Sequence, residues 1–261
     1  MQPVIVLGQQ PNGILPKRFF IAKLRTARRL QQELGGRIIW FCHDADHDPQ
    51  ETRTRIPSDQ HPDGFIEINF SFANKTQRKF TPLAHKAVGD LSVIRETLRH
   101  HAPSVLDAFD AVQAQTVADW CIQMYQELGL LDGVEVVRSS DPAFRKKAVV
   151  DDLERGWFYD TQWSGEIVRA RLENSRLSLH RGGDAYEDLG VLEDVDVTRI
   201  SPGWEKRFDW MQSVLDATHY VAGASEQEYL AGITITRPAT MVSRETIDDP
   251  SLAFIPEVTK N

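Results

Sequence analysis

The sequence predicts an α/β fold, a mostly parallel sheet flanked by helices, and three neighbouring segments predict it. Residues 3–7 form an unbroken apolar run that ends at Gly8, the pattern of a strand buried on both faces. Residues 16–34 have the pattern of an amphipathic helix that ends at a Gly-Gly pair. A second apolar run, residues 37–42, completes a strand-helix-strand unit, the building block of parallel sheets.

The remaining elements are predicted from periodicity and from turn residues. In chain order they are a hairpin of strands 64–72 and 78–81, helices 84–100 and 104–128, a strand at 134–137, a helix from Pro142, a hairpin of strands 166–171 and 176–180, a helix at 204–215, a strand at 219–222, a helix at 226–231 and a strand at 239–243. We expect one domain over residues 1–261, with 52–132 and 157–200 as inserted connecting segments. The second hairpin marks a small inserted module.

Composition limits the class of partner. The chain is 41% apolar with 12 Phe and 6 Trp, enough for a sizeable core, and its formal charge is −8. Proteins that bind nucleic acids or anionic membranes usually carry clustered Lys and Arg, so neither is an expected partner. The expected partner is a small-molecule substrate. No basic leader or long apolar run is present, which favours the cytoplasm. The sequence does not indicate an oligomeric state.

Two features of the chain are expected to be structural. Cys42 and Cys121 lie in apolar surroundings and are predicted to be free thiols rather than a disulfide or a zinc site. The one basic segment, Lys17 to Arg29, is predicted to be the charged, solvated side of the first helix. Local phosphate binding by this segment stays open.

The loop from Gly8 to Gly13 is the first candidate site. It has neither the Gly-Lys-Ser/Thr ending of a P-loop nor the spacing of a dinucleotide-binding fingerprint. A glycine-bounded loop between a strand and a helix can still aim its backbone N–H groups, and the amides of Gln9, Gln10 and Asn12, at an anion. The alternative is a tight turn with surface amides.

The second candidate site follows the second strand, where Asp44, Asp46 and Asp48 lie within five residues beside His47. Carboxylates this close repel one another unless a cation, a protonated ligand or backbone donors compensate, and such clusters often mark function. A divalent metal and an exposed acidic turn are the alternatives. A right-handed crossover places both loops at the same edge of the sheet, so we expect them to share one cleft.

A third loop, Gly223-Ala224-Ser225-Glu226, brings small residues and a helix start to the same edge. The alternative is helix capping alone, with Ser225 as the N-cap and Glu228 three residues later. Arg237 and Arg244 flank the final strand and could face an acidic substrate or solvent.

Four segments, in order over residues 3–244, together resemble the cysteine-adding enzymes of bacillithiol synthesis, the ligases that join cysteine to glucosaminyl-malate. Val6 to Gln10 is similar to that family's first strand and Thr-Gly-Gln-Gln loop. Trp40-Phe41 followed by Asp46-His47-Asp48 resembles its Phe-Trp strand and Glu-Asp-His-Asp motif. Residues 136–142 are similar to its strand ending in Asp-Pro-Ser-Asp-Pro, and residues 220–229 to its Tyr-Val-Gly-Gly-Pro-Gly-Glu segment.

The resemblance implies a Rossmann-like core similar to nucleotidylyltransferases. Carried over by position, it places in the cleft Gln9, Gln10, Asp46, His47, Asp48, Gly223 and Glu226. This sequence departs from the family in three respects. It lacks the heptads of the C-terminal coiled coil, so dimerisation by that route is not expected. Gly-Pro-Gly-Glu is replaced by Gly223-Ala224-Ser225-Glu226, and Pro11-Asn12 follows Gln10 where the family has Ala-Gly.

The resulting expectation is a ligase-like enzyme that joins a cysteine-like amino acid to a small polar metabolite, with ATP or another nucleotide as the cofactor to test and no metal. His47 is the expected base, and Asp46 or Asp48 would orient it or hold the substrate ammonium. The expected substrate-binding residues are Gly8, Gln9, Gln10, Asn12, Gly13, Gly223, Ser225 and Glu226. The alternatives are a non-catalytic binding remnant of the fold and a metal-dependent hydrolase with Asp44, His47 and Asp48 as ligands.

Overall fold

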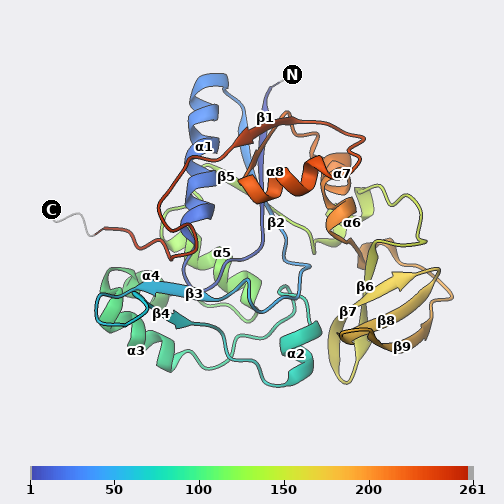
Figure 1. The fold of residues 1–261 in the computed structure, drawn as a ribbon, viewed down its shortest axis with the longest axis horizontal. Helices are drawn as coiled ribbons and strands as arrows, with labels where there is room; N and C mark the ends of the chain where they lie inside the picture. Colours follow the sequence, from blue (N-terminus) through green and yellow to red (C-terminus); the bar gives the residue numbers. More distant parts are fainter. Residues whose placement is uncertain (1, 258–261) are drawn as a thin grey trace.

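A five-stranded parallel sheet forms the centre of the structure, a computed structural model that describes residues 2–257 (Figure 1). The strand order is β12-β11-β1-β2-β5. The bounds are Val4–Gln9 for β1, Arg37–Cys42 for β2, Val134–Arg138 for β5, His219–Ala222 for β11 and Thr240–Ser243 for β12. The predicted α/β class with a mostly parallel sheet is confirmed. In chain order, β2 and β5 are added on one side of β1, and β11 and β12 on the other. The topological switch point of the sheet therefore lies between β1 and β11.

Helices cover both faces of this sheet, and alternate strand residues enter two separate hydrophobic clusters. In β1, Ile5 and Leu7 pack on one side and Val6 on the other. The first side is covered by α1 (Arg18–Leu34) and α5 (Val117–Glu127), and the second by α6 (Pro142–Lys147), α7 (Trp204–Leu215) and α8 (Ala224–Ala231). Both cysteines are buried and free, as predicted.

A second, antiparallel sheet has the strand order β10-β6-β7-β8-β9 and stands beside the parallel sheet (Figure 1). Its strands are β6 (Trp157–Trp163), β7 (Glu166–Glu173), β8 (Arg176–Gly182), β9 (Ala185–Val191) and β10 (Ile200–Pro202), with a short 3-10 helix, η2 (Val197–Arg199), before the last. The predicted hairpin is β7 and β8, so that prediction is confirmed. The module is larger than expected because β6, β9 and β10 extend it.

Two predictions for the segment between β2 and β5 are wrong. Strand β4 (Phe65–Ile68) pairs with β3 (Thr54–Pro57), whereas residues 75–80 form helix α2, capped by the Asn74 side chain. The two long helices predicted at 84–100 and 104–128 are shorter pieces: α3 (Ser92–His101), a 3-10 helix η1 (Pro103–Val105), α4 (Leu106–Ala111) and α5. The backbone N–H groups of Val88 and Val117 bond instead to Gln115 and Lys86, which ties this segment together outside any helix. Among the described residues, no helix is both long enough and apolar enough to cross a bilayer.

Candidate active site

The first two candidate loops meet at the carboxyl edge of the parallel sheet. Strands β1 and β2 are in parallel register from Val4 opposite Arg37 onward, so the loops that follow them leave the same edge. Gln10 Nε2 donates to Asp46 Oδ2 at 3.3 Å, which joins one loop to the other. The expected adjacency of the two loops is therefore confirmed, but the prediction that they share one cleft is wrong, because no residue of 8–13 lines the cleft described below.

Asp46 is the centre of the charged network at this edge. Its carboxylate accepts from Arg207 Nη2 of α7 at 3.3 Å and from the backbone N–H of His47 at 2.7 Å, and Arg169 Nη1 of β7 lies 3.9 Å away. Burial by itself raises the pKa of Asp46, but Arg207 and Arg169 outweigh it and hold that pKa well below its usual range. Asp46 is a fixed anion at any physiological pH.

Arg169, on β7 of the second sheet, is one of the two cations in this network. Its side chain is 5% exposed, its guanidinium lies 3.9 Å from the centroid of the Phe158 ring, and it donates to Ser201 Oγ and to the Pro202 carbonyl. Burial lowers its pKa to about 10, against the opposing effect of Asp46, and so it stays charged at neutral pH.

His47 is a neutral imidazole beside these charges. Burial and the positive charge of Arg169 lower its pKa to about 4, although Asp46 acts in the opposite direction. Its Nδ1 lies 3.8 Å from Asp46 Oδ1 and has no hydrogen-bond partner within residues 2–257. Nδ1 is enclosed by protein atoms, so a ligand can reach the ring only through Nε2, which makes no hydrogen bond to residues 2–257 and could accept a proton in the tautomer that keeps its own proton on Nδ1.

Lys86, which the sequence did not single out, holds the His47 loop in place. Its fully buried ammonium group donates to the backbone carbonyls of His47 and Arg78, and so ties the loop to α2. Burial lowers the pKa of Lys86 to about 7, in spite of the nearby charges of Asp46 and Asp48.

This pKa predicts a pH dependence of stability. Between about pH 7 and pH 10.5 the unfolded chain carries a proton on Lys86 that the folded chain does not, so the free energy of unfolding should rise with pH, by at most about 5 kcal/mol. Urea unfolding at pH 7, 8, 9 and 10 would measure this rise. Lys86→Met removes the titrating group and should flatten the curve; parallel curves for the two proteins would contradict the assignment.

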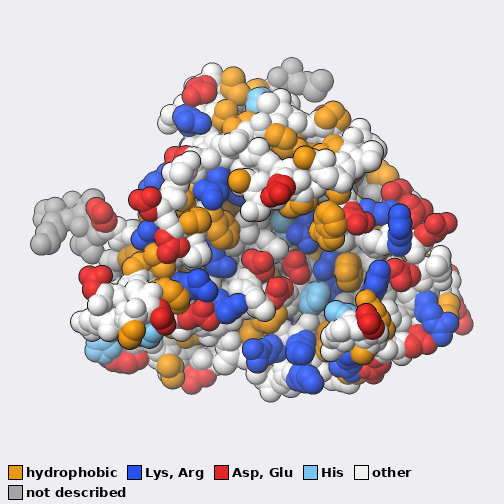
Figure 2. Space-filling model, viewed as in Figure 1, with side chains coloured by type: hydrophobic (Ala, Val, Ile, Leu, Met, Phe, Trp, Pro, Cys, Tyr) orange, Lys and Arg blue, Asp and Glu red, His pale blue; other side chains and the backbone are white. Residues whose placement is uncertain are grey.

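A cleft of about 940 Å³ opens beside His47, between α2, the second sheet and the start of α7. Besides His47 and Asp48 it is lined by cationic groups and aromatic rings, among them Arg78, Lys79, Arg155, Arg169, Arg171, Arg181, Phe80, Trp157, Phe158, Tyr186 and Trp204. Figure 2 shows Lys and Arg side chains gathered at the lower centre of the view, over the position of α2 in Figure 1.

The charge of this cleft is unbalanced. Arg171 and Arg181 pair with glutamates, but Arg78, Lys79 and Arg155 make no ion pair with any residue in the range 2–257. The acids of the lining are Asp48 and Glu205. The cleft therefore suits an anionic ligand with an apolar or planar part.

The Gly8–Gly13 loop is largely buried and does not line the cleft. Gly13 has φ +115°, and a Cβ there would lie 2.4 Å from the Thr52 carbonyl oxygen, so only glycine fits. Asn12 is fully buried, and its backbone N–H donates to Tyr125 Oη at 3.0 Å. Gln9 donates to Gln10, whose amide reaches the site only through Asp46.

The third loop is tied to the switch point rather than to the cleft. Lys23 Nζ of α1 lies 2.6 Å from Glu226 Oε2, and Tyr220 Oη donates to Glu226 Oε1 at 2.7 Å. Glu226 also accepts from the backbone N–H of Gly223, and Ser225 is exposed on α8. Lys23 is 4% exposed, so the prediction that this residue belongs to a solvated helix face is wrong.

The same cluster fills the crevice between β1 and β11. Lys23 donates to the Gly8 carbonyl at 2.7 Å, and a Cβ added to Gly8 would lie 2.2 Å from Tyr220 Oη. In open parallel sheets this crevice is where ligands bind. Here side chains of the protein occupy it.

The three aspartates of the second loop have three different surroundings. Asp44 is fully buried and accepts from Arg138, Ser139 and Ser140. Asp48 is exposed, and its carboxylate accepts from the backbone N–H of Gln50. Over residues 2–257 the structure has no group of three His, Cys, Asp or Glu side chains that could hold a metal ion. Asp44, His47 and Asp48 therefore do not converge on the metal site that the hydrolase alternative requires.

A comparison with protein-family models found no match to the chain, and a comparison with curated proteins found none either.

Proposed function

We propose that this chain is a ligase-like enzyme that joins the amino group of an amino acid to a carboxyl group of a small anionic metabolite in the 940 Å³ cleft. The observation that carries the proposal is the position of His47, a neutral imidazole, at the wall of a cleft with an excess of positive charge. The resemblance to cysteine-adding ligases of Rossmann-like fold supports the reaction class.

The residues of the cleft would have different roles in the reaction. Arg78, Lys79 and Arg155 lack protein partners and would bind the carboxylates or phosphates of the ligands. In the reaction we propose, a nucleoside triphosphate first converts the carboxylate of the metabolite to an acyl phosphate or acyl adenylate. The amine then attacks the acyl carbon, the phosphate or nucleoside monophosphate leaves with the electrons of the broken C–O bond, and the amine loses a proton. The His47 imidazole would accept that proton through Nε2, and the fixed carboxylate of Asp46, 3.8 Å from Nδ1, would stabilise the imidazolium that forms.

A pKa of about 4 makes His47 a weak base in the empty cleft. Its pKa is low because of burial and because Arg169 faces it. A bound anion would offset that positive charge and raise the pKa of His47 toward neutrality. The base would then gain strength only when the substrate is bound.

A direct test is incubation of the protein with glucosaminyl-malate, cysteine and ATP, with amide formation followed by mass spectrometry. His47→Gln should lower the rate by about 100-fold or more, because the proton acceptor is lost. The free energy of unfolding should change by no more than about 1 kcal/mol, because His47 lies at the cleft wall. The matched control is His61→Gln, an exposed histidine outside the cleft, which should retain full activity.

The outcomes separate the candidates. Titration calorimetry with the same three compounds tests binding apart from turnover. Binding without amide formation would replace the ligase with a non-catalytic binding protein. Absence of both, repeated with a wider set of organic acids and amino acids, would refute the proposal.

A further inference from the structure

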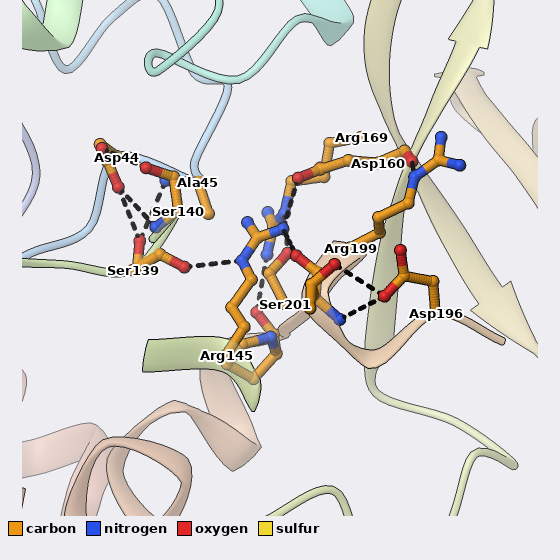
Figure 3. Close-up of polar contacts among 12 residues, drawn as sticks. Asp44, Ala45, Ser139, Ser140, Arg145, Asp160, Arg169, Asp196, Arg199 and Ser201 are labelled. Atoms are coloured by element: carbon orange, nitrogen blue, oxygen red, sulfur yellow. Dashed lines mark hydrogen bonds and ion pairs between the residues drawn. The ribbon is translucent and has the colours of Figure 1, made fainter. Parts of the chain in front are cut away.

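The 940 Å³ cleft has an excess of positive charge that a second cavity lacks. The second cavity, of about 680 Å³, is bounded by α6, β6 and η2 and is lined by three Arg and three Asp side chains. Its Arg145 reaches from α6 to Asp160, with 2.6 Å between Nη1 and Oδ2 (Figure 3), and its Arg138 pairs with Asp44 and Asp119. The first cleft, with six Lys and Arg side chains against two acids, is the stronger site for an anionic ligand.

An exposed indole ring lines the same cleft. Trp204, the first residue of α7, is 54% exposed. Its ring contacts the Tyr229 ring edge to face, with 5.9 Å between the centroids and 87° between the planes, and this contact orients the indole. Within residues 2–257, no cationic group and no other ring stacks on Trp204. The indole therefore offers a free face to a planar group of a ligand.

The other exposed aromatic ring of the cleft, Tyr186, is already in contact with protein groups. The Arg171 guanidinium lies over the ring, 5.7 Å from its centroid, and donates to the Tyr186 hydroxyl at 3.1 Å. The His180 ring lies 5.1 Å from the Tyr186 ring between centroids. Trp204 is therefore the better stacking surface for a ligand.

Arg155 lies next to Trp204 in the fold. The antiparallel pairing of β10 with β6 continues beyond the strands, since the Gly203 N–H donates to the Gly156 carbonyl at 2.7 Å. Arg155 and Trp204 are the next residues on these two segments, and both line the cleft. The exposed Arg155 guanidinium makes no hydrogen bond and no ion pair within the described residues. One part of the cleft wall thus presents a free aromatic face and a free cationic group.

Arg78 and Lys79 form the cationic part of the wall beside His47. Both are exposed residues in the last turn of α2, and neither has an ion-pair partner in the range 2–257. The Lys86 ammonium group donates to the backbone carbonyls of both Arg78 and His47, which holds this end of α2 against the His47 loop. An anionic group bound by Arg78 and Lys79 would therefore lie on the His47 side of the cleft.

We infer that the cleft binds a nucleoside triphosphate, with the base stacked on Trp204 and the terminal phosphates held by Arg78 and Lys79. Arg155, next to the indole, donates to the phosphate nearest the base. The inference rests on the proposed ligase function, for which it assigns the position of the nucleotide to the 940 Å³ cleft and not to the filled switch point between β1 and β11. Every base has a face that can stack, so purine and pyrimidine nucleotides should both bind.

The test is titration calorimetry with ATP and with inorganic tripolyphosphate, in the absence of amino acid and metabolite. ATP should bind with a Kd of about 1 mM or tighter, and about 10-fold more tightly than tripolyphosphate, because only ATP has a base to stack. Trp204→Ala should remove this advantage and leave tripolyphosphate binding unchanged, whereas Trp204→Phe, which keeps a ring, should retain most of it. The matched control is Phe65→Ala, on β4 and outside the cleft, which should change neither affinity.

The phosphate contacts are tested on α2. Lys79→Gln should weaken the binding of ATP and of tripolyphosphate by the same factor, about 10-fold, because both ligands lose one cationic donor. Lys75→Gln is the matched control, since Lys75 is an exposed lysine of the same helix that does not line the cleft. It should leave both affinities unchanged. A loss of ATP binding alone in Lys79→Gln would contradict the assignment of the phosphates to this end of α2.

The nucleotide site and the ligase reaction can fail separately. Base-dependent binding of ATP to a protein that forms no amide would uphold the site and leave a nucleotide-binding protein in place of the ligase. Amide formation by Trp204→Ala with the wild-type kcat and the wild-type KM for ATP would overturn the site alone. Equal affinity for ATP and tripolyphosphate, no binding of ATP at about 10 mM, or tighter binding of a single-stranded oligonucleotide than of ATP would also overturn it.

Discussion

Asp46→Asn is expected to lower the free energy of unfolding by about 3 kcal/mol or more, and to abolish any activity of the cleft. The substitution removes the negative charge that Arg207 and the nearly buried Arg169 share, and leaves their positive charges uncompensated. It also removes the group that would stabilise a protonated His47, whose pKa should fall still further below about 4. Urea unfolding at pH 7 measures the first effect, and NMR titration of the His47 ring measures the second.

Asp48→Asn is the matched control, because Asp48 is an exposed aspartate two residues along the same loop. It should change the free energy of unfolding by no more than about 0.5 kcal/mol. Equal losses for the two variants would mean that the loop as a whole, and not the buried charge, determines the effect. An unchanged pKa of His47 in Asp46→Asn would exclude Asp46 as the group that stabilises the imidazolium.

The central sheet could be predicted because its strands carry the signal in their own residues. Runs such as Ile38-Ile39-Trp40-Phe41 are short and apolar on both faces, the pattern of a strand that is buried between two layers. The meeting of the Gln10 and Asp46 loops followed from topology alone, since parallel neighbours end at one edge. The strands of the central sheet and the edge at which their loops meet could therefore be predicted from the sequence.

The partners of the site residues could not be derived in this way. Asp46 is paired by Arg207 and Arg169, which come from α7 and β7, far along the chain. The sequence indicated that the negative charges of three clustered aspartates need to be compensated, but it did not indicate which cationic side chain would pair with each aspartate. Alternation in β7 places Arg169 and Arg171 on the face opposite Val168 and Ala170, which from the sequence predicts a solvated Arg169, so its burial against Asp46 carried no local signal.

The segment between β2 and β5 was predicted poorly for a different reason. Its elements are short, and tertiary contacts fix them more than periodicity does. Lys86 is the example, because an ordinary lysine in the sequence becomes a buried anchor whose role depends on the carbonyls of His47 and Arg78. Residue type alone predicts an exposed lysine.

Lys23→Met is expected to lower the free energy of unfolding by about 3 kcal/mol or more. Lys23 is buried, and its ammonium group joins Glu226 of α8 to the carbonyl of Gly8, across the crevice between β1 and β11. The substitution leaves the Glu226 carboxylate, itself 15% exposed, with Tyr220 and a backbone N–H as its remaining partners. Urea unfolding and titration calorimetry with nucleotides would be measured on the same preparation.

The double variant Lys23→Met with Glu226→Gln distinguishes a structural plug from a ligand site. If the pair only closes the crevice, removal of both charges should recover most of the lost stability, and the two substitutions should couple by about 1–3 kcal/mol. Nucleotide binding should then be unchanged in every variant, because the cationic groups of the 940 Å³ cleft lie elsewhere. Lys23→Met could instead abolish nucleotide binding while stability is unchanged. The switch point would then be a ligand site, and the nucleotide would bind near Gly8, Gly223 and Glu226, as the sequence predicted, rather than in the 940 Å³ cleft.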